Sequence, residues 1–244
     1  MAGTIDTAVV AQDEAVTGAP CTTAPVRRLR DNGLTIVLML LFAISILGQW
    51  LAGWQVAKRD AIRHGAPLLH PLDYAASPEF IAAVFENWES EFLQMATYVV
   101  LTALLYQRGS AESKDPDRRQ RRDADFAGLA GKPGTPAILA WGAIWRAIYA
   151  RSLGIALTLL FFGSFIVHWT QSARVAAGTA TAHGEVPPTT LDYLFSAQLW
   201  FESLQNWQSE FLSTAVLIVL SIFLRQRESP ESKAVAAPHG QTGP

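Results

Sequence analysis

Two long stretches without a charged residue constrain this chain more than any other feature of its sequence. Twenty-six uncharged residues lie between Asp31 and Lys58, and 22 lie between Arg151 and Arg174. A helix of roughly 20 apolar residues can cross the hydrocarbon core of a bilayer. We therefore expect membrane-spanning helices at about residues 33–56 and 152–173. The composition agrees, since only 16% of the residues are charged, against roughly a quarter in soluble domains.

Two shorter apolar runs complete the predicted architecture. Residues 92–107 and 211–224 hold 16 and 14 uncharged residues, which is short of the roughly 20 needed to cross. Each run must recruit flanking residues, so we expect these spans at about 88–107 and 207–225. The sequence therefore predicts an all-α integral membrane protein with four transmembrane helices and interfacial helices beside them.

The second half of the chain repeats the first at an offset of 119 residues. Aligning residues 27–114 with 146–233 without a gap gives 34 identities in 88 positions. The longest matches pair NWESEFL (87–93) with NWQSEFL (206–212), and QRGSAESK (107–114) with QRESPESK (226–233). Each copy holds two predicted spans, so both copies enter the membrane in the same direction. We expect two parallel two-helix repeats, at 26–114 and 145–233.

These paired motifs resemble those of an uncharacterised bacterial membrane-protein family, mostly actinobacterial, whose function is unknown. The resemblance covers about residues 26–233. It implies a membrane location and no activity, and it transfers no catalytic or binding residue to this chain.

The distribution of basic residues predicts the orientation. Of 19 Lys and Arg residues, 15 lie in the tails and the central linker; the other four are Lys58, Arg59, Arg63 and Arg174. By the positive-inside rule, both termini and the linker face the cytoplasm. The resemblance to a bacterial family implies that the membrane is the bacterial plasma membrane.

The segments outside the repeats lack a membrane-spanning pattern. Residues 1–25 contain no apolar signal-peptide core and are predicted to be a disordered tail, as are residues 234–244. Residues 115–144 form a charged cytoplasmic linker. An interfacial helix is expected at its end, with an apolar face made by Ile138, Trp141, Trp145 and Ile148.

Each repeat places one carboxylate near the predicted outer membrane surface. Counting 1.5 Å per residue outward from the cytoplasmic anchor Arg108 puts Trp88 in the outer aromatic belt and Glu91 one turn deeper. The matching residues of the second copy are Arg227, Trp207 and Glu210. A carboxylate facing lipid is costly, so we expect both glutamates to face the helix bundle.

A polar site is predicted around these glutamates. Gln49 and its counterpart His168 lie at nearly the same depth as Glu91 and Glu210, so the four side chains could converge near the pseudo-twofold axis. A stripe of polar residues also marks one side of the helix in the first copy. It contains Asn87, Glu91, Gln94, Tyr98 and Thr102, and its clearest counterparts are Asn206, Glu210 and Ser213.

Two interpretations of this site stay open. Intramembrane polar residues commonly serve as interhelical hydrogen-bond partners, and Asn87 and Asn206 suit helix N-caps. Alternatively, membrane carboxylates beside His or Gln mark paths for protons, cations or small polar solutes. The retention of Glu91 and Glu210 in both copies favours the second interpretation, whereas the lack of a helix broken by Gly or Pro weakens it.

Other function classes lack support in the sequence. The net charge of −2 argues against nucleic-acid binding, and Cys21 alone forms no disulfide or metal cluster. His64 and His183 have no second His at ligand spacing, and we find no catalytic motif. We therefore expect no cofactor, no metal and no enzymatic activity.

The function that the sequence favours is a non-enzymatic structural or interaction protein of the membrane. Its expected partners are the lipid bilayer and a second copy of the chain or another membrane protein. The alternative is a small channel or proton-linked carrier that uses Glu91 and Glu210 near the outer face.

Overall fold

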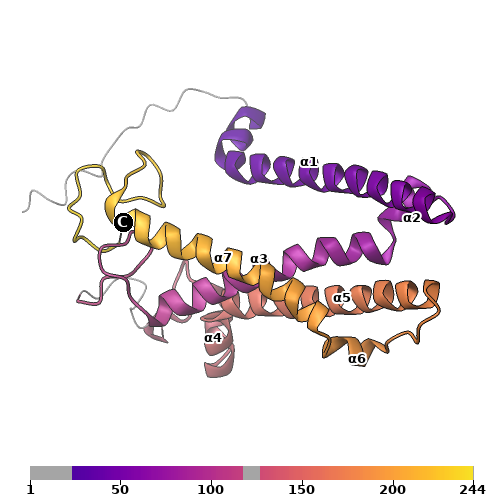
Figure 1. Ribbon diagram of the computed structural model, residues 1–244. Helices are drawn as coiled ribbons and strands as arrows, with labels where there is room; N and C mark the ends of the chain where they lie inside the picture. Colours follow the sequence, from indigo (N-terminus) through magenta and orange to yellow (C-terminus); the bar gives the residue numbers. More distant parts are fainter. Residues whose placement is uncertain (1–23, 118–126, 244) are drawn as a thin grey trace, which may run out of the picture. The chain divides into compact units, whose positions relative to one another are not determined.

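The computed structural model describes residues 24–117 and 127–243, and in these residues the fold is all-α, as predicted (Figure 1). The seven α-helices are α1 (Ala24–His64), α2 (Pro71–Ala75), α3 (Pro78–Leu104), α4 (Ala143–Tyr149), α5 (Ser152–Ala182), α6 (Thr190–Leu194) and α7 (Ala197–Phe223). Two 3₁₀ turns, η3 (Ala127–Leu129) and η4 (Ala137–Ala140), precede α4.

Three of these helices are long and apolar enough to cross a membrane. They are residues Asp31–His64 of α1, all of α5 and all of α7. The predicted span at about 88–107, in α3, is not among them, although α3 has the same length as α7. The physical reason is polarity, because Glu89, Glu91 and Gln94 all fall within that stretch of α3.

Helices α2 and α3 recur as α6 and α7 with every boundary moved by 119 residues. The cap chemistry recurs as well, since the hydroxyl of Ser77 accepts the N–H of Phe80 at 3.3 Å and the hydroxyl of Ser196 accepts the N–H of Leu199 at 3.2 Å. A serine oxygen in this position satisfies a backbone donor that has no partner inside the helix. The prediction that Asn87 and Asn206 cap helices is wrong, because both lie inside α3 and α7.

A break near the start of the preceding helix recurs in the same way. Helix α1 contains one non-helical residue, Asn32, with φ −126° and ψ 15°. Its counterpart Arg151 separates α4 from α5 and has nearly the same conformation, φ −119° and ψ 8°. The long N-terminal helix of the first copy therefore corresponds to α4 followed by α5 in the second.

The chain divides into two compact units, residues 1–68 and 69–244. The first contains α1. In the second, α3 packs along α5 and crosses α7 (Figure 1). A small apolar core of Ala173, Tyr193 and Leu199 joins α5, α6 and the start of α7. The indole N–H of Trp169 on α5 donates to the Thr190 carbonyl at 2.8 Å, which fastens α6 to α5.

Two predicted segments differ from the structure where it describes them. The expected interfacial helix is divided into η4 and α4 at Gly142, whose φ of 118° interrupts the helix and favours glycine. Residues 234–243, predicted to be disordered, form turns around the buried Lys233 ammonium group, which donates to the Gly109, His239 and Gln241 carbonyls at 2.5, 2.9 and 3.0 Å. The predicted N-terminal tail up to residue 23 and linker residues 118–126 lie outside the described residues.

Candidate functional site

A fully buried histidine on α5 meets a fully buried glutamate on α3. The His168 Nδ1 atom lies 2.8 Å from Glu89 Oε2, and neither side chain is exposed. On its other side, His168 Nε2 lies 3.6 Å from Glu202 Oε2 on α7. This distance exceeds hydrogen-bond length, and Nε2 has no hydrogen-bond partner among the described residues. Three helices thus supply one imidazole and two carboxylates.

Helix α7 provides neutral donors to the glutamates of α3. The indole N–H of Trp207 donates to Glu89 Oε1 at 2.9 Å, so both oxygens of the Glu89 carboxylate have a partner. One turn away, the Asn206 amide donates to Glu86 Oε1 at 2.7 Å. Buried carboxylates need such donors, because an unpaired charge away from water is very costly.

The protonation of the imidazole decides how many of these contacts it can satisfy. A neutral imidazole donates through one nitrogen only, whereas an imidazolium donates through both. The positions of Glu89 and Glu202 at opposite ring nitrogens therefore suit an imidazolium. The carboxylates also affect a neighbouring tyrosine on α6. Burial and then the charges of Glu202 and Glu86 raise the pKa of Tyr193 to about 12.

The structure gives the predicted glutamates Glu91 and Glu210 a different place from this cluster. Both lie where α3 crosses α7, Glu91 exposed and Glu210 half-buried, and the charge of Glu91 acts on Glu210. The partner of His168 is Glu89, two positions before Glu91. Two helical positions correspond to about 200° around the axis, which is nearly the opposite face.

The other predicted site residues separate into different environments. The Asn87 amide donates to the Ala83 carbonyl of its own helix at 2.7 Å, unlike Asn206, which reaches another helix. Gln49 belongs to the other unit, on α1. The polar stripe of α3 faces α7, since the Gln94 amide donates to the Thr214 hydroxyl at 2.6 Å.

The predicted membrane anchors are also in distinct settings. Trp88 contacts the ring of Phe85, with 5.0 Å between centroids. Trp207 is half-buried and donates to the buried Glu89 carboxylate. Arg108 forms an exposed ion pair with Asp117 at 2.6 Å, which lowers the pKa of the Asp117 carboxyl. Arg227 lies 3.2 Å from Glu228, also in an exposed pair.

Sequence reasoning missed Glu86, Glu89 and Glu202. At all three positions the other copy has an uncharged residue, respectively Gln205, Gln208 and Ala83, so a search for residues retained in both copies passes over them. A usable signal was present, because Glu89 shares a helical face with the small residues Ala82 and Ala96. A carboxylate on the face that packs against another helix needs a buried partner.

The QRxSxESK motif forms the same loop after α3 and after α7. The Ser113 hydroxyl accepts the Gln107 N–H at 2.8 Å, and the Ser232 hydroxyl accepts the Gln226 N–H at 2.9 Å. A bond of 2.8 Å between the Ser110 and Ser221 hydroxyls ties the first loop to α7. The motif therefore closes the end of each helix with side-chain hydrogen bonds.

The part of the chain that the structure describes contains no group of three or more His, Cys, Asp or Glu residues able to hold a metal ion. His64 and His183 each place Nδ1 against a carbonyl of their own helix, at 2.9 and 2.8 Å.

Fold and site together define a class: an all-α protein with helices able to cross a membrane and a buried cluster of one imidazole and carboxylates between three helices. Residues 26–244 match the model of a family described as a domain of unknown function (DUF6766), and the chain belongs to that family. No curated protein and no solved structure matches the chain.

Proposed function

We propose that this protein is a four-span integral membrane protein of the bacterial plasma membrane that acts as a non-enzymatic structural or interaction protein. It consists of two parallel repeats, and both termini lie in the cytoplasm. In chain order, α3 is the second of the four spans. The matching bounds and caps of α2–α3 and α6–α7 support the repeat.

The observation that carries this proposal is the use of buried polar groups as links between helices. Glu89 joins α3 to both α5 and α7, Asn206 joins α7 to Glu86, and Gln94 joins α3 to Thr214. Such contacts hold helices together where water is excluded. They also lower the cost of placing Glu89 of α3 in a membrane, because its carboxylate has partners on α5 and α7.

Contact surfaces lie on the short helices at one end of the bundle. Leu72 on α2 is 65% exposed, and Leu191 and Phe195 at α6 are 62% and 78% exposed. Helix α2 packs against the rest of the protein through Tyr74, and α6 does so through Tyr193. The exposed apolar residues of these helices are therefore not part of the core. Exposed apolar patches of this kind suit a membrane surface or a protein partner.

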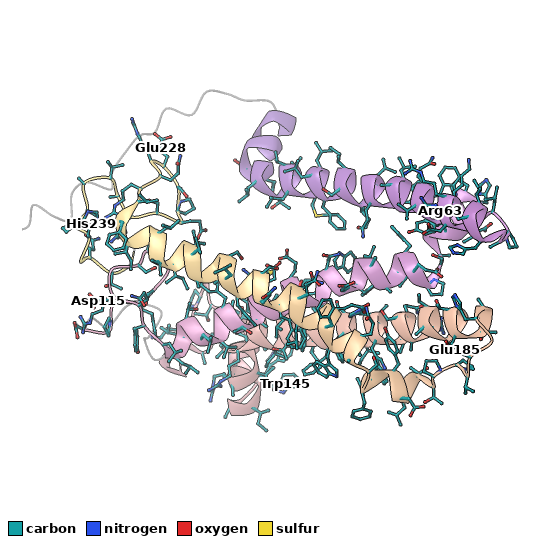
Figure 2. The ribbon with its side chains drawn as sticks, viewed as in Figure 1. Arg63, Asp115, Trp145, Glu185, Glu228 and His239 are labelled. Carbon is teal, nitrogen blue, oxygen red and sulfur yellow. The ribbon has the colours of Figure 1, made fainter. Side chains whose placement is uncertain are left out.

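Topology is tested with single cysteines in a Cys21→Ala background. Glu185 follows α5 and Glu228 follows α7, at opposite ends of the helices (Figure 2). A membrane-impermeant maleimide should label Glu185→Cys in intact cells, and should label Glu228→Cys only after the cells are opened. Labelling of both positions in intact cells contradicts the proposed topology.

The interaction role is tested by crosslinking in native membranes. Phe195→Cys should crosslink to a second copy or to another membrane protein, whereas the matched Glu228→Cys control at the opposite end should not give the same product. A chain that remains an isolated monomer at both positions would count against an interaction protein.

A second candidate function is a channel or proton-linked carrier. One observation favours it: His168 lies between two carboxylates, and its Nε2 makes no hydrogen bond in the described residues. A buried imidazole in that setting can exchange a proton. The predicted pair Glu91 and Glu210, where α3 and α7 cross, would be the outer entrance.

This second candidate is tested in proteoliposomes by following pH-dependent flux. The double variant Glu91→Gln, Glu210→Gln should abolish flux, as should His168→Gln. The control Gln208→Ala, at an exposed position of α7, should retain it. Absence of flux in the parent protein would remove the carrier from consideration and leave the structural role.

A further inference from the structure

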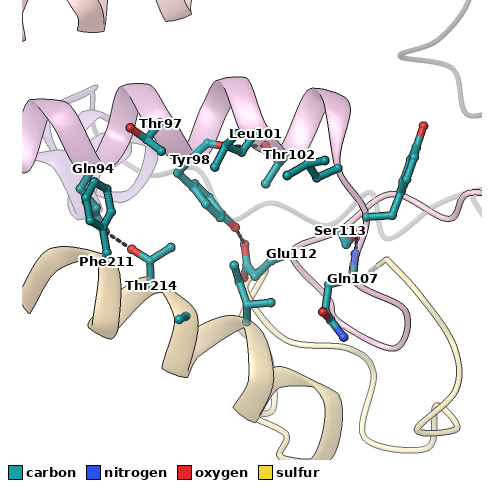
Figure 3. Close-up of a pocket in the computed structure, with 14 residues that line it drawn as sticks. Gln94, Thr97, Tyr98, Leu101, Thr102, Gln107, Glu112, Ser113, Phe211 and Thr214 are labelled. Atoms are coloured by element: carbon teal, nitrogen blue, oxygen red, sulfur yellow. Dashed lines mark hydrogen bonds between the residues drawn. The ribbon is translucent and has the colours of Figure 1, made fainter. Parts of the chain in front are cut away.

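A pocket lies between α3 and α7 near the ends of the two helices (Figure 3). Its volume is about 460 Å³, and it is partly open to the surroundings. Leu101 and Leu105 on the α3 side and Ala215 and Ile218 on the α7 side make most of its wall apolar. Ligand sites typically combine such a wall with a few polar groups at fixed positions.

Glu112, on the loop after α3, provides a carboxyl group at one end of this pocket. Its Oε2 atom accepts a hydrogen bond from the Tyr98 hydroxyl (Figure 3). Its Oε1 atom is buried and has no hydrogen-bond partner among the described residues. The described lining residues include no Lys, Arg or His, so Glu112 is their one charged group.

The surroundings of Glu112 call for a positive ligand. Burial raises the pKa of its carboxyl group, and the nearby Glu231 carboxylate raises it further, while the bond from Tyr98 acts in the opposite direction. A positively charged donor at Oε1 would fill the missing hydrogen bond and offset both unfavourable effects. Bonds between an ammonium group and a carboxylate are among the strongest in proteins.

One positive side chain near the pocket already has contacts of its own. The Lys114 ammonium is 5.6 Å from the ring centroid of Tyr106, which lines the pocket. The charged group that the pocket can offer to a ligand is therefore Glu112, which complements a head group that carries an ammonium group.

We propose that the pocket binds phosphatidylethanolamine, with its ammonium group on Glu112 and one acyl chain in the apolar groove between α3 and α7. Positions 94 to 104 of α3 cover about 15 Å at 1.5 Å per residue, enough for a large part of an acyl chain. The inference rests on the proposed membrane position of these helices, which puts their C-terminal ends at head-group level.

Native mass spectrometry of the full chain tests this inference. The protein is reconstituted with equal amounts of phosphatidylethanolamine and phosphatidylglycerol, extracted in mild detergent, and its retained lipid is measured. We expect the parent chain to retain phosphatidylethanolamine preferentially. Glu112→Gln keeps an acceptor for Tyr98 but removes the charge, and should weaken retention about tenfold, as expected for one charge-assisted hydrogen bond.

Two further variants separate the charge from the groove. Glu228→Gln removes an exposed carboxylate outside the pocket and should leave retention unchanged. Ala215→Trp fills the groove and should reduce retention of the lipid while the charge of Glu112 stays. Equal retention by the parent chain and Glu112→Gln, or a preference for phosphatidylglycerol, would overturn the inference.

The outcome is distinguishable from failure of the proposed function. A chain that does not insert into vesicles contradicts the membrane proposal itself. A chain that inserts with the labelling pattern expected of Glu185→Cys and Glu228→Cys, but shows no lipid preference, contradicts only the phosphatidylethanolamine site.

Discussion

Helices α3 and α7 have matching bounds and the same serine cap, yet they bury different groups. Helix α3 buries Glu89 and Ser90 among small apolar residues where it packs on α5. Helix α7 buries Leu199, Ser203 and Ser221, and its position matching Glu89 is the exposed Gln208. Similar sequences therefore form nearly the same helix but give it different neighbours.

Residues that are identical in the two halves of the sequence do different things. Ser77 and Ser196 both cap a helix, whereas Trp207, which is identical to Trp88, donates to Glu89 in the site. The ionisable members of the cluster, Glu89, His168 and Glu202, lie at positions where the two halves of the sequence differ. The cluster therefore depends on residues that the two halves do not share.

The largest expected difference between the helices is at the matched positions Glu89 and Gln208. Glu89→Ala leaves His168 and the Trp207 N–H without their buried partner, so we expect a loss of about 3–5 kcal/mol in unfolding free energy. Gln208→Ala changes an exposed side chain and should cost less than about 0.5 kcal/mol. Denaturant unfolding in detergent micelles measures both. Similar losses for the two variants would show that the helices do not differ in this way.

A smaller difference is expected at Asn206 and Asn87. Asn206→Ala removes a donor from the Glu86 carboxylate of another helix and should cost about 1.5 kcal/mol, the lower end for bonds to charged groups, because Glu86 is half-buried. Asn87→Ala removes only a bond to its own exposed helix turn and should cost less than about 0.5 kcal/mol. The same unfolding measurement applies, and a larger loss for Asn87→Ala would reverse the assignment.

Much of the helical framework could be predicted from the sequence, but the pairing of helix faces could not. The all-α fold and a long apolar helix over the predicted span at 207–225 are present. The choice of Glu91 over Glu89 failed to find the partner of His168, because helical spacing identifies faces without telling which neighbour each face meets. Helix α5 packs on the Glu89 face, and Trp207 of α7 reaches the same carboxylate.

The end of the chain shows a second limit of sequence reasoning. Residues 234–243 have no hydrophobic periodicity, so their sequence predicts disorder. The structure holds them through carbonyl groups that surround the Lys233 ammonium. Backbone carbonyls are present in every residue, so a side chain that gathers them leaves no pattern in the sequence.

The caps test the similarity of the two helices. Ser77→Ala and Ser196→Ala each remove one side-chain acceptor from a backbone N–H, at 3.3 and 3.2 Å, and each should cost about 1 kcal/mol. The matched replacement by Gly should cost only a few tenths of a kcal/mol. Unfolding free energies of the four variants provide the measurement. A clear inequality between the two alanine variants would show that the starts of α3 and α7 are held differently.

The smallest expected effect distinguishes the loops after the two helices, at Glu112 and Glu231. Burial raises the pKa of Glu112 above its ordinary value of 4.5, whereas Glu231 is exposed. A raised carboxyl pKa means that folding favours the protonated form. This group therefore costs nothing well below pH 4.5, begins to oppose folding as the pH rises through 4.5, and opposes it fully above the raised value. The groups facing Glu112 are Tyr98 from α3 and Glu231 from the loop after α7.

Unfolding measured from pH 4 to pH 8 in detergent free of phosphatidylethanolamine tests this sign. Glu112→Gln should match the parent chain at the acidic end and become the more stable of the two as the pH rises. Glu231→Gln removes the charge of a neighbour that raises the pKa of Glu112 but leaves the burial of Glu112 unchanged, so it should reproduce a smaller part of the same gain. If Glu112→Gln became less stable than the parent at high pH, the Glu112 carboxylate would be stabilised by a cation within the fold, and the pocket would not need one from a lipid.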